Sequence, residues 1–147
     1  MKQEDKDLLL KDLCARLPYG VICATTDNDG SLPNIWKIVK ADMINEDFFL
    51  IHDSHVASKT VDVKEVKPYL FPLSSMTEEQ KKFFKDRPIF LDSDNDLVVK
   101  EDFLGNSQFT MLNDWVEVIL WLVKNHFDYR GLISKGLAED ATNLNIY

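Results

Sequence analysis

Glycine is scarce in this chain, with only five among 147 residues. A P-loop requires G-x-x-x-x-G-K-S/T, and a dinucleotide-binding turn requires G-x-G-x-x-G, because only glycine lets the backbone approach a phosphate so closely. Neither pattern occurs, and the G-x-S-x-G elbow of many serine hydrolases is also missing. These glycine-dependent classes of nucleotide-binding protein and hydrolase are therefore excluded.

Cysteine is rarer still, and the two present, Cys14 and Cys23, form no C-x-x-C pair. Two isolated cysteines suit a reducing cytoplasm. Cys14 lies on an apolar helical stripe and Cys23 lies in a strand, and neither has a basic neighbour in sequence that would lower its thiol pKa. Ser74 and Ser75 precede a helix start, where they favour a turn. We therefore predict no catalytic residue and no cofactor.

Long hydrophobic runs and basic runs are missing as well. The most apolar stretch, "WVEVILWLV" at 115–123, is half a membrane span and is interrupted by Glu117. The beginning, "MKQEDKDLLLKDL", carries acids and does not resemble a signal peptide. The chain has 25 acidic and 17 basic residues, a net charge of −8, and no Lys/Arg run exceeds two. We expect a cytoplasmic protein with no membrane segment and no non-specific nucleic-acid binding.

The first half of the chain predicts one helix followed by strands. Leu10, Cys14 and Leu17 recur at i, i+4 and i+7, which indicates a helix over 4–17 that Pro18 ends. From about 19 to 70 the sequence has the character of strands, with a hairpin turn at 27–30 and a second turn at 44–47. This half predicts four strands in a curled antiparallel sheet or small open barrel.

The second half is mainly helical. Thr77 and Gln80 form a capping-box pattern that begins a short helix, which ends before Pro88. A hairpin around "SDND", a long helix over 108–125 and a final short helix capped by Asp128 follow. The prediction is an α+β fold with a helical C-terminus, in one globular domain over 1–147.

Three alternating aspartates, Asp92, Asp94 and Asp96, resemble the start of a calcium loop. An EF-hand loop also needs glycine at its sixth position and a glutamate at its twelfth. Those positions hold Leu97 and Phe103. We therefore predict a turn and no metal site, and leave open whether the three carboxylates hold a cation weakly.

His52 and His55, with Asp53 between them, could contribute metal ligands. Residues three apart on a strand point to opposite faces, so a shared metal would need a turn there. Polar residues in a loop are the favoured interpretation. The alternative is a small metal- or ligand-binding enzyme that uses these histidines and nearby aspartates.

The stretch "NHFDYRGLISKGLA" places His126, Phe127, Tyr129 and Arg130 at a predicted corner between helices. Aromatic residues and arginine are enriched where proteins bind each other, so these four are candidate interaction residues. The alternative is that Phe127 and Tyr129 pack the corner while Arg130 pairs with an acid.

The long helix is apolar around more than one face. Trp115, Ile119, Leu122 and Val123 share one stripe, and Val116, Leu120 and Trp121 widen it. In a monomer, we expect the sheet and the final helix, through Leu132, Ile133 and Leu137, to bury both tryptophans. Otherwise another subunit or a partner must cover them.

Three stretches, "LCARLPYGV", "KPYLFPLSSMTEEQ" and "NHFDYRGLISKGLA", resemble signature stretches of an uncharacterised family of short proteins from gut-bacterial prophages and mobile elements. The resemblance implies a bacterial or phage cytoplasmic context and supplies no activity, cofactor or site. We expect a non-enzymatic protein-interaction module with an unidentified protein partner. The alternatives are the small enzyme described above and an oligomeric structural component.

Overall fold

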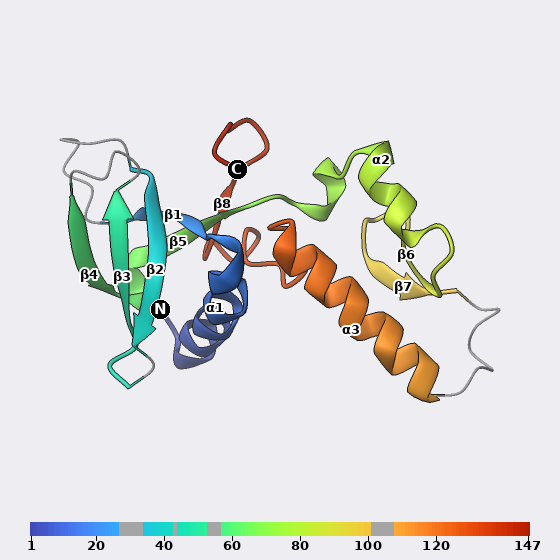
Figure 1. The fold of residues 1–147 in the computed structure, drawn as a ribbon, viewed down its shortest axis with the longest axis horizontal. Coiled ribbons are helices and arrows are strands. Elements are labelled where there is room, and N and C mark those ends of the chain that lie inside the picture. Colours follow the sequence, from blue (N-terminus) through green and yellow to red (C-terminus); the bar gives the residue numbers. More distant parts are fainter. Residues whose placement is uncertain (27–33, 43, 53–56, 101–107) are drawn as a thin grey trace.

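The computed structural model describes residues 1–26, 34–42, 44–52, 57–100 and 108–147, and the side chains of 108–110 are excluded. Its helices and strands are α1 (Gln3–Arg16), β1 (Ile22–Thr25), β2 (Trp36–Asp42), β3 (Asp47–His52), β4 (Ser58–Asp62), β5 (Val66–Leu70), α2 (Glu78–Lys81), β6 (Ile89–Leu91), β7 (Leu97–Val99), α3 (Gln108–Lys124) and β8 (Glu139–Asp140). Short 3-10 turns separate several of them. The predicted α+β class is confirmed (Figure 1).

The main sheet has six strands in the described part of the chain, in the order β4-β3-β2-β1-β5-β8. All neighbours are antiparallel except β5 and β8. Four strands were expected. The sequence after β4 turns at Val63–Glu65, where Asp62 accepts a hydrogen bond from the Lys64 N–H, and then forms β5. The sheet is not closed, and the hairpin turn predicted at 27–30 lies outside the described residues.

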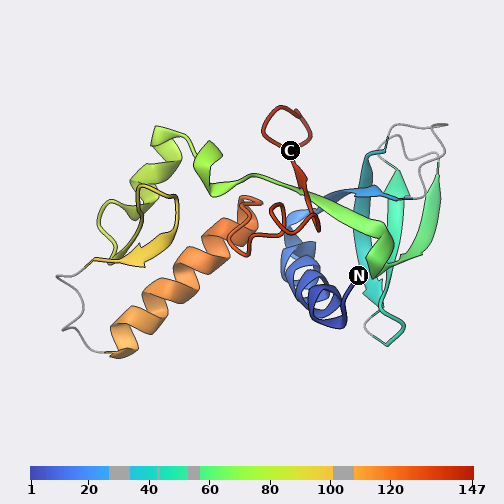
Figure 2. The same cartoon turned by 180° about the vertical axis from the view of Figure 1, so that it is seen from behind.

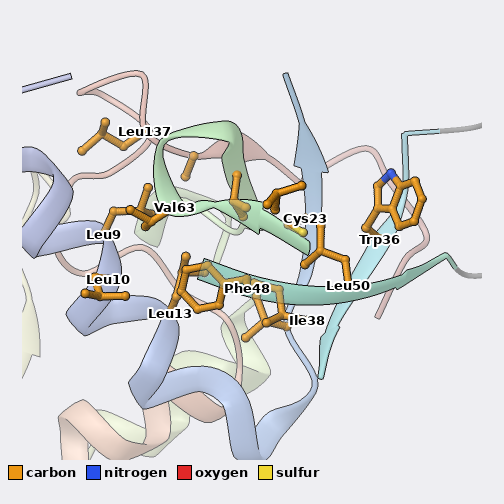
Figure 3. Close-up of a cluster of buried hydrophobic side chains, with 14 of the residues drawn as sticks. Leu9, Leu10, Leu13, Cys23, Trp36, Ile38, Phe48, Leu50, Val63 and Leu137 are labelled. Atoms are coloured by element: carbon orange, nitrogen blue, oxygen red, sulfur yellow. The ribbon is translucent and has the colours of Figure 1, made fainter. Parts of the chain in front are cut away.

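α1 covers one face of this sheet and forms the first hydrophobic core. Leu9, Leu10 and Leu13 recur at helical spacing and are buried. Strand residues that alternate toward the same side, such as Ile38, Phe48 and Leu50, meet them. Figure 3 shows these side chains converging between α1 and the strands. The helix predicted over 4–17 is confirmed with its end at Arg16, followed by a 3-10 turn at Leu17–Tyr19.

A second core lies away from the sheet. Its buried members come from α3 and the residues just after it, the β6–β7 hairpin and the segment around α2: Met76, Phe84, Ile89, Val118, Leu122 and Phe127. Figures 1 and 2 both show α3 beside this hairpin, on the opposite side of the molecule from β4. With two clusters in one chain, the single domain over 1–147 stays a prediction.

The predicted local turns have clear physical causes. Thr77 Oγ1 accepts the Gln80 N–H at 3.3 Å, and Gln80 Oε1 accepts the Thr77 N–H at 2.8 Å, which confirms the capping box. In the β6–β7 turn, Asp92 Oδ1 accepts the N–H groups of Asp94 and Asp96, both at 2.9 Å. That carboxylate organises the hairpin, as expected for an aspartate in a turn.

The predicted final helix is wrong. Residues 129–137 form successive turns, although Asp128 still accepts the N–H groups of Leu132 and Ile133 at 2.8 Å each. Gly131 and Gly136 take positive φ values of 68° and 70°, which an α-helix cannot accommodate. Two left-handed residues within nine positions therefore interrupt the helix that the apolar spacing indicated.

The expected cover for α3 is wrong too. Leu132, Leu137 and the half-buried Ile133 belong to the first core, with the sheet and α1. Trp115 and Trp121 are only half-buried, and they pack in the second core. The Trp121 ring stacks on Phe83 with centroids 4.5 Å apart. α3 is therefore covered by the hairpin and the α2 segment, and the described residues leave one side of it without cover.

Candidate functional site

A buried arginine joins the two cores at the point where α1 and α3 meet. Arg16 and Asp12 are both 0% exposed, one turn apart on α1. Arg16 Nε lies 2.6 Å from Asp12 Oδ2, and Nη2 lies 3.2 Å from Oδ1. The same guanidinium donates to the carbonyls of Phe127, at 2.9 Å, and of Val123, at 3.5 Å. A cation at the carbonyl end of α3 is favoured by the helix dipole.

The four candidate interaction residues gather at this junction. Phe127 is 1% exposed and His126 is 6% exposed, so both are interior residues. Tyr129 and Arg130 are half-buried, and Arg130 Nε lies 3.3 Å from Asp12 Oδ1. Their burial fits the packing alternative for Phe127 and the ion-pair alternative for Arg130. A role in binding a partner stays a prediction, for which Tyr129 and Arg130 retain exposed surface.

His126 is held neutral in this junction. Burial, followed by the nearby positive charge of Arg16, lowers its pKa from 6.5 to about 4. Its ring stacks on Tyr147 at 3.8 Å between centroids, and its backbone has a positive φ of 58°. The buried Nδ1 atom has no hydrogen-bond partner among the described residues.

The side of α3 that no described residue covers carries three large apolar side chains. Leu112, Val116 and Leu120 are 60%, 50% and 52% exposed. They recur at i, i+4 and i+8, so they form one line about 12 Å long on the helix surface. We call this line the α3 stripe. Val118 and Leu122, on the opposite side, are fully buried.

One end of the α3 stripe adjoins the buried contact between the ends of α1 and α3. Val123 follows Leu120 by three residues, so it lies in the same line, and it is 2% exposed. At Val123 the end of α1 approaches α3, since Arg16 donates to its carbonyl. Figure 1 shows the two helices running apart from this point. The stripe therefore begins at the junction and extends outward along α3.

The other candidate residues are not brought together for chemistry. His52 is buried and its ring contacts Trp36 edge-on at 5.1 Å, while His55 and Asp53 lie outside the described residues. Where the structure describes side chains, no group of three His, Cys, Asp or Glu residues is placed to hold a metal ion. The expectation of no metal site stays a prediction.

The thiols sit in environments that suppress reactivity. Burial raises the pKa of Cys23 to about 12, against a smaller opposite effect from Lys59. Burial also raises the pKa of Cys14. Ser75 donates its hydroxyl proton to the Pro72 carbonyl at 2.8 Å in a 3-10 turn. A thiol that stays protonated is a poor nucleophile.

The sequence predicted that α3 is apolar on more than one face and left open whether another subunit or a partner covers it, but it did not distinguish the α3 stripe from the buried side. The helix is apolar around most of its circumference, so periodicity alone does not separate Val116 and Leu120 from Val118 and Leu122. Only the arrangement of the hairpin and α2 decides which side is covered. None of the described helices is both long and apolar enough to cross a membrane.

Comparisons with family models, with curated proteins and with solved structures found no match for this chain.

Proposed function

We propose that this chain is a non-enzymatic protein-interaction module that binds a protein partner through the α3 stripe. The observation that carries the proposal is the exposure of Leu112, Val116 and Leu120 along one line of a well-packed helix. Aligned apolar exposure on a rigid element is typical of protein interfaces. The resemblance to prophage and mobile-element proteins suggests an accessory role in a bacterial cytoplasm.

The expected partner presents an apolar helix or groove of its own. Recognition of a helix face uses apolar anchors about one helical turn apart, which insert into a complementary apolar surface. Polar residues border the stripe on its outer side: Asn113, Glu117 and Lys124 are all exposed. An apolar centre with a polar rim is the usual composition of such an interface.

The partner would also approach the junction, because the stripe begins beside it. Tyr129 and Arg130 are half-buried there and carry the aromatic and guanidinium groups that commonly anchor interfaces. The Arg130 guanidinium lies 4.9 Å from the Tyr129 ring centre, which holds the two groups together. This is the part of the predicted interaction set that a partner could contact.

Site-specific photocrosslinking in lysate of the native host tests the proposal. A photoreactive phenylalanine analogue replaces Val116. In the control it replaces Thr60, which is exposed on β4, the edge strand of the main sheet. We expect position 116 to yield a discrete crosslinked protein. Excess unlabelled wild-type chain should compete that product away, and a Leu112→Glu/Leu120→Glu chain should not. Identical products from positions 116 and 60 would refute the interface.

The oligomeric alternative is separated by repeating the crosslinking with purified chain. A crosslinked dimer from position 116 alone, together with a mass in analytical ultracentrifugation that falls in the Leu112→Glu/Leu120→Glu chain, would identify the stripe as a contact between copies. The protein partner would then be a second copy, and the chain an oligomeric component.

A further inference from the structure

A pocket of about 220 Å³ lies between the α2 segment and the β6–β7 hairpin, away from the junction. Six residues line it: Lys81, Phe84, Lys85, Phe90, Leu91 and Lys100. Half of them are lysines and none is acidic, in a chain whose net charge is −8. A concentration of one charge against the overall charge of the protein creates a local positive potential.

The lysines differ in how far their charges are already neutralised. Lys81 Nζ lies 2.8 Å from Glu78 Oε1, in an exposed ion pair one turn away. Lys100 Nζ donates to the Lys85 carbonyl at 3.1 Å, which ties the end of the hairpin to the segment after α2. No ion pair involves Lys85 or Lys100 within the described ranges. Lys85 is an exposed lining residue, and the Lys100 ammonium is held beside the Lys85 carbonyl, so two lysines that form no ion pair with the described residues border this pocket.

The remaining residues that line the pocket have apolar side chains. Phe84 is 5% exposed and is part of the second core, while Phe90 and Leu91 are half-buried on the hairpin. Aromatic and aliphatic walls gain free energy by covering an apolar group. Ligand sites generally combine such a lining with a small number of polar groups that orient the ligand.

From this arrangement we infer that the pocket binds a small organic anion: an aromatic or aliphatic body between Phe84, Phe90 and Leu91, with a carboxylate facing Lys85 and Lys100. Lysine supplies a compact positive charge on a flexible stem, which suits a carboxylate at the mouth of a pocket. This inference does not depend on the α3 stripe or on the proposed function.

The test is an NMR titration of the full chain with 3-phenylpropionate and, separately, with its neutral amide. The acid should shift the ring resonances of Phe84 and Phe90, and the amide should bind at least fivefold more weakly. Lys85→Gln and Lys100→Gln should each weaken binding of the acid about two- to fivefold, the range of one partly exposed ion pair. Lys82→Gln is the matched control, because Lys82 is paired with Glu79 and does not line the pocket.

The outcomes separate cleanly. Selective loss of acid binding in the Lys85→Gln and Lys100→Gln chains, with the melting temperature of the Lys85→Gln chain unchanged, would support the site. Equal binding of acid and amide would overturn it, since the ammonium groups would then play no part. Weakening by Lys82→Gln equal to that by Lys85→Gln would also overturn it, because only the general charge of the segment would matter. Absence of shifts at Phe84 and Phe90 with millimolar acid would do the same.

Discussion

Arg16 donates to the backbone carbonyl of Phe127 at 2.9 Å, joining residues 111 positions apart in sequence. The same guanidinium holds both oxygens of Asp12. One side chain therefore balances a buried carboxylate on α1 and satisfies a carbonyl just beyond the end of α3. The relative position of the two helices, and so the place where the α3 stripe begins, depends on this contact.

Replacing Arg16 by methionine should lower the free energy of unfolding by about 3–5 kcal/mol, because it leaves Asp12 buried without its main counter-charge. Urea denaturation measures the change. Arg130→Met is the matched control: its ion pair with Asp12 is at the edge of the network, with the Arg130 side chain 33% exposed. The control should cost clearly less. Equal losses for the two variants would contradict a central role for Arg16.

Protonation of His126 should make the protein less stable in mild acid. Its pKa is lowered to about 4 in the folded chain against 6.5 for an unperturbed group, so the unfolded chain takes up the proton first as the pH falls. The free energy of unfolding is therefore unaffected by His126 above about pH 6.5. As the pH falls from about 6.5 to 4, the free energy of unfolding decreases by up to about 3 kcal/mol. Urea denaturation at a series of pH values measures it.

The control for that prediction is His126→Asn. Asparagine tolerates the positive φ of 58° at this position but does not titrate. Hydrogen bonds lower the pKa values of half-buried carboxylates such as Asp42 and Asp62, which therefore contribute to the loss of stability in acid in both chains. The difference between the two pH profiles isolates the histidine. Parallel profiles would show that His126 does not couple to folding in this range.

Local patterns predicted local structure well, and tertiary arrangement was where prediction failed. The Thr77–Gln80 cap and the Asp92 turn depend on side chains that bond neighbouring backbone, so a short stretch contains all the information. The cover of α3 depends on where a hairpin far along the chain folds. Apolar spacing at 129–137 indicated a helix, and two left-handed glycines, Gly131 and Gly136, overrode it.

The Thr77 cap gives a direct test of the α2 start. Thr77→Ala removes the acceptor for the Gln80 N–H and should cost about 1 kcal/mol. Thr77→Ser keeps a hydroxyl at the same place and should cost much less. Both are measured by thermal or urea unfolding. Equal losses in the two chains would mean that the methyl group of Thr77, rather than its hydroxyl, stabilises this region.

Calcium should leave the melting temperature unchanged at millimolar concentration, compared with chelator. Asp92 Oδ1 already accepts two backbone N–H groups, so it is occupied within the turn. A site filled at a hundredfold excess over its Kd would stabilise the fold by about 2.7 kcal/mol, which a thermal scan detects easily. An upward shift that disappears in Asp94→Asn/Asp96→Asn would show that these carboxylates hold the ion.

Trp121 and Leu120 are neighbours on α3 with opposite environments, and their substitution compares core with surface. The Trp121 ring stacks against Phe83, at 4.5 Å, and against Phe127, at 5.7 Å. Leu120 lies in the α3 stripe and is 52% exposed. Because Trp121 is half-buried in the second core, Trp121→Ala should cost about 2–3 kcal/mol, below the value for a fully buried aromatic.

Leu120→Ala should cost less than about 1 kcal/mol in the isolated chain, because an exposed side chain leaves no cavity behind. Urea denaturation at two protein concentrations measures both variants. Leu120→Ala would instead show a large loss if Leu120 is buried in a contact between copies. In that case the difference in free energy of unfolding between the wild-type and Leu120→Ala chains would be larger at the higher protein concentration. The stripe would then be covered by a second copy, and Leu112→Ala, at the other end of it, should show the same dependence on concentration.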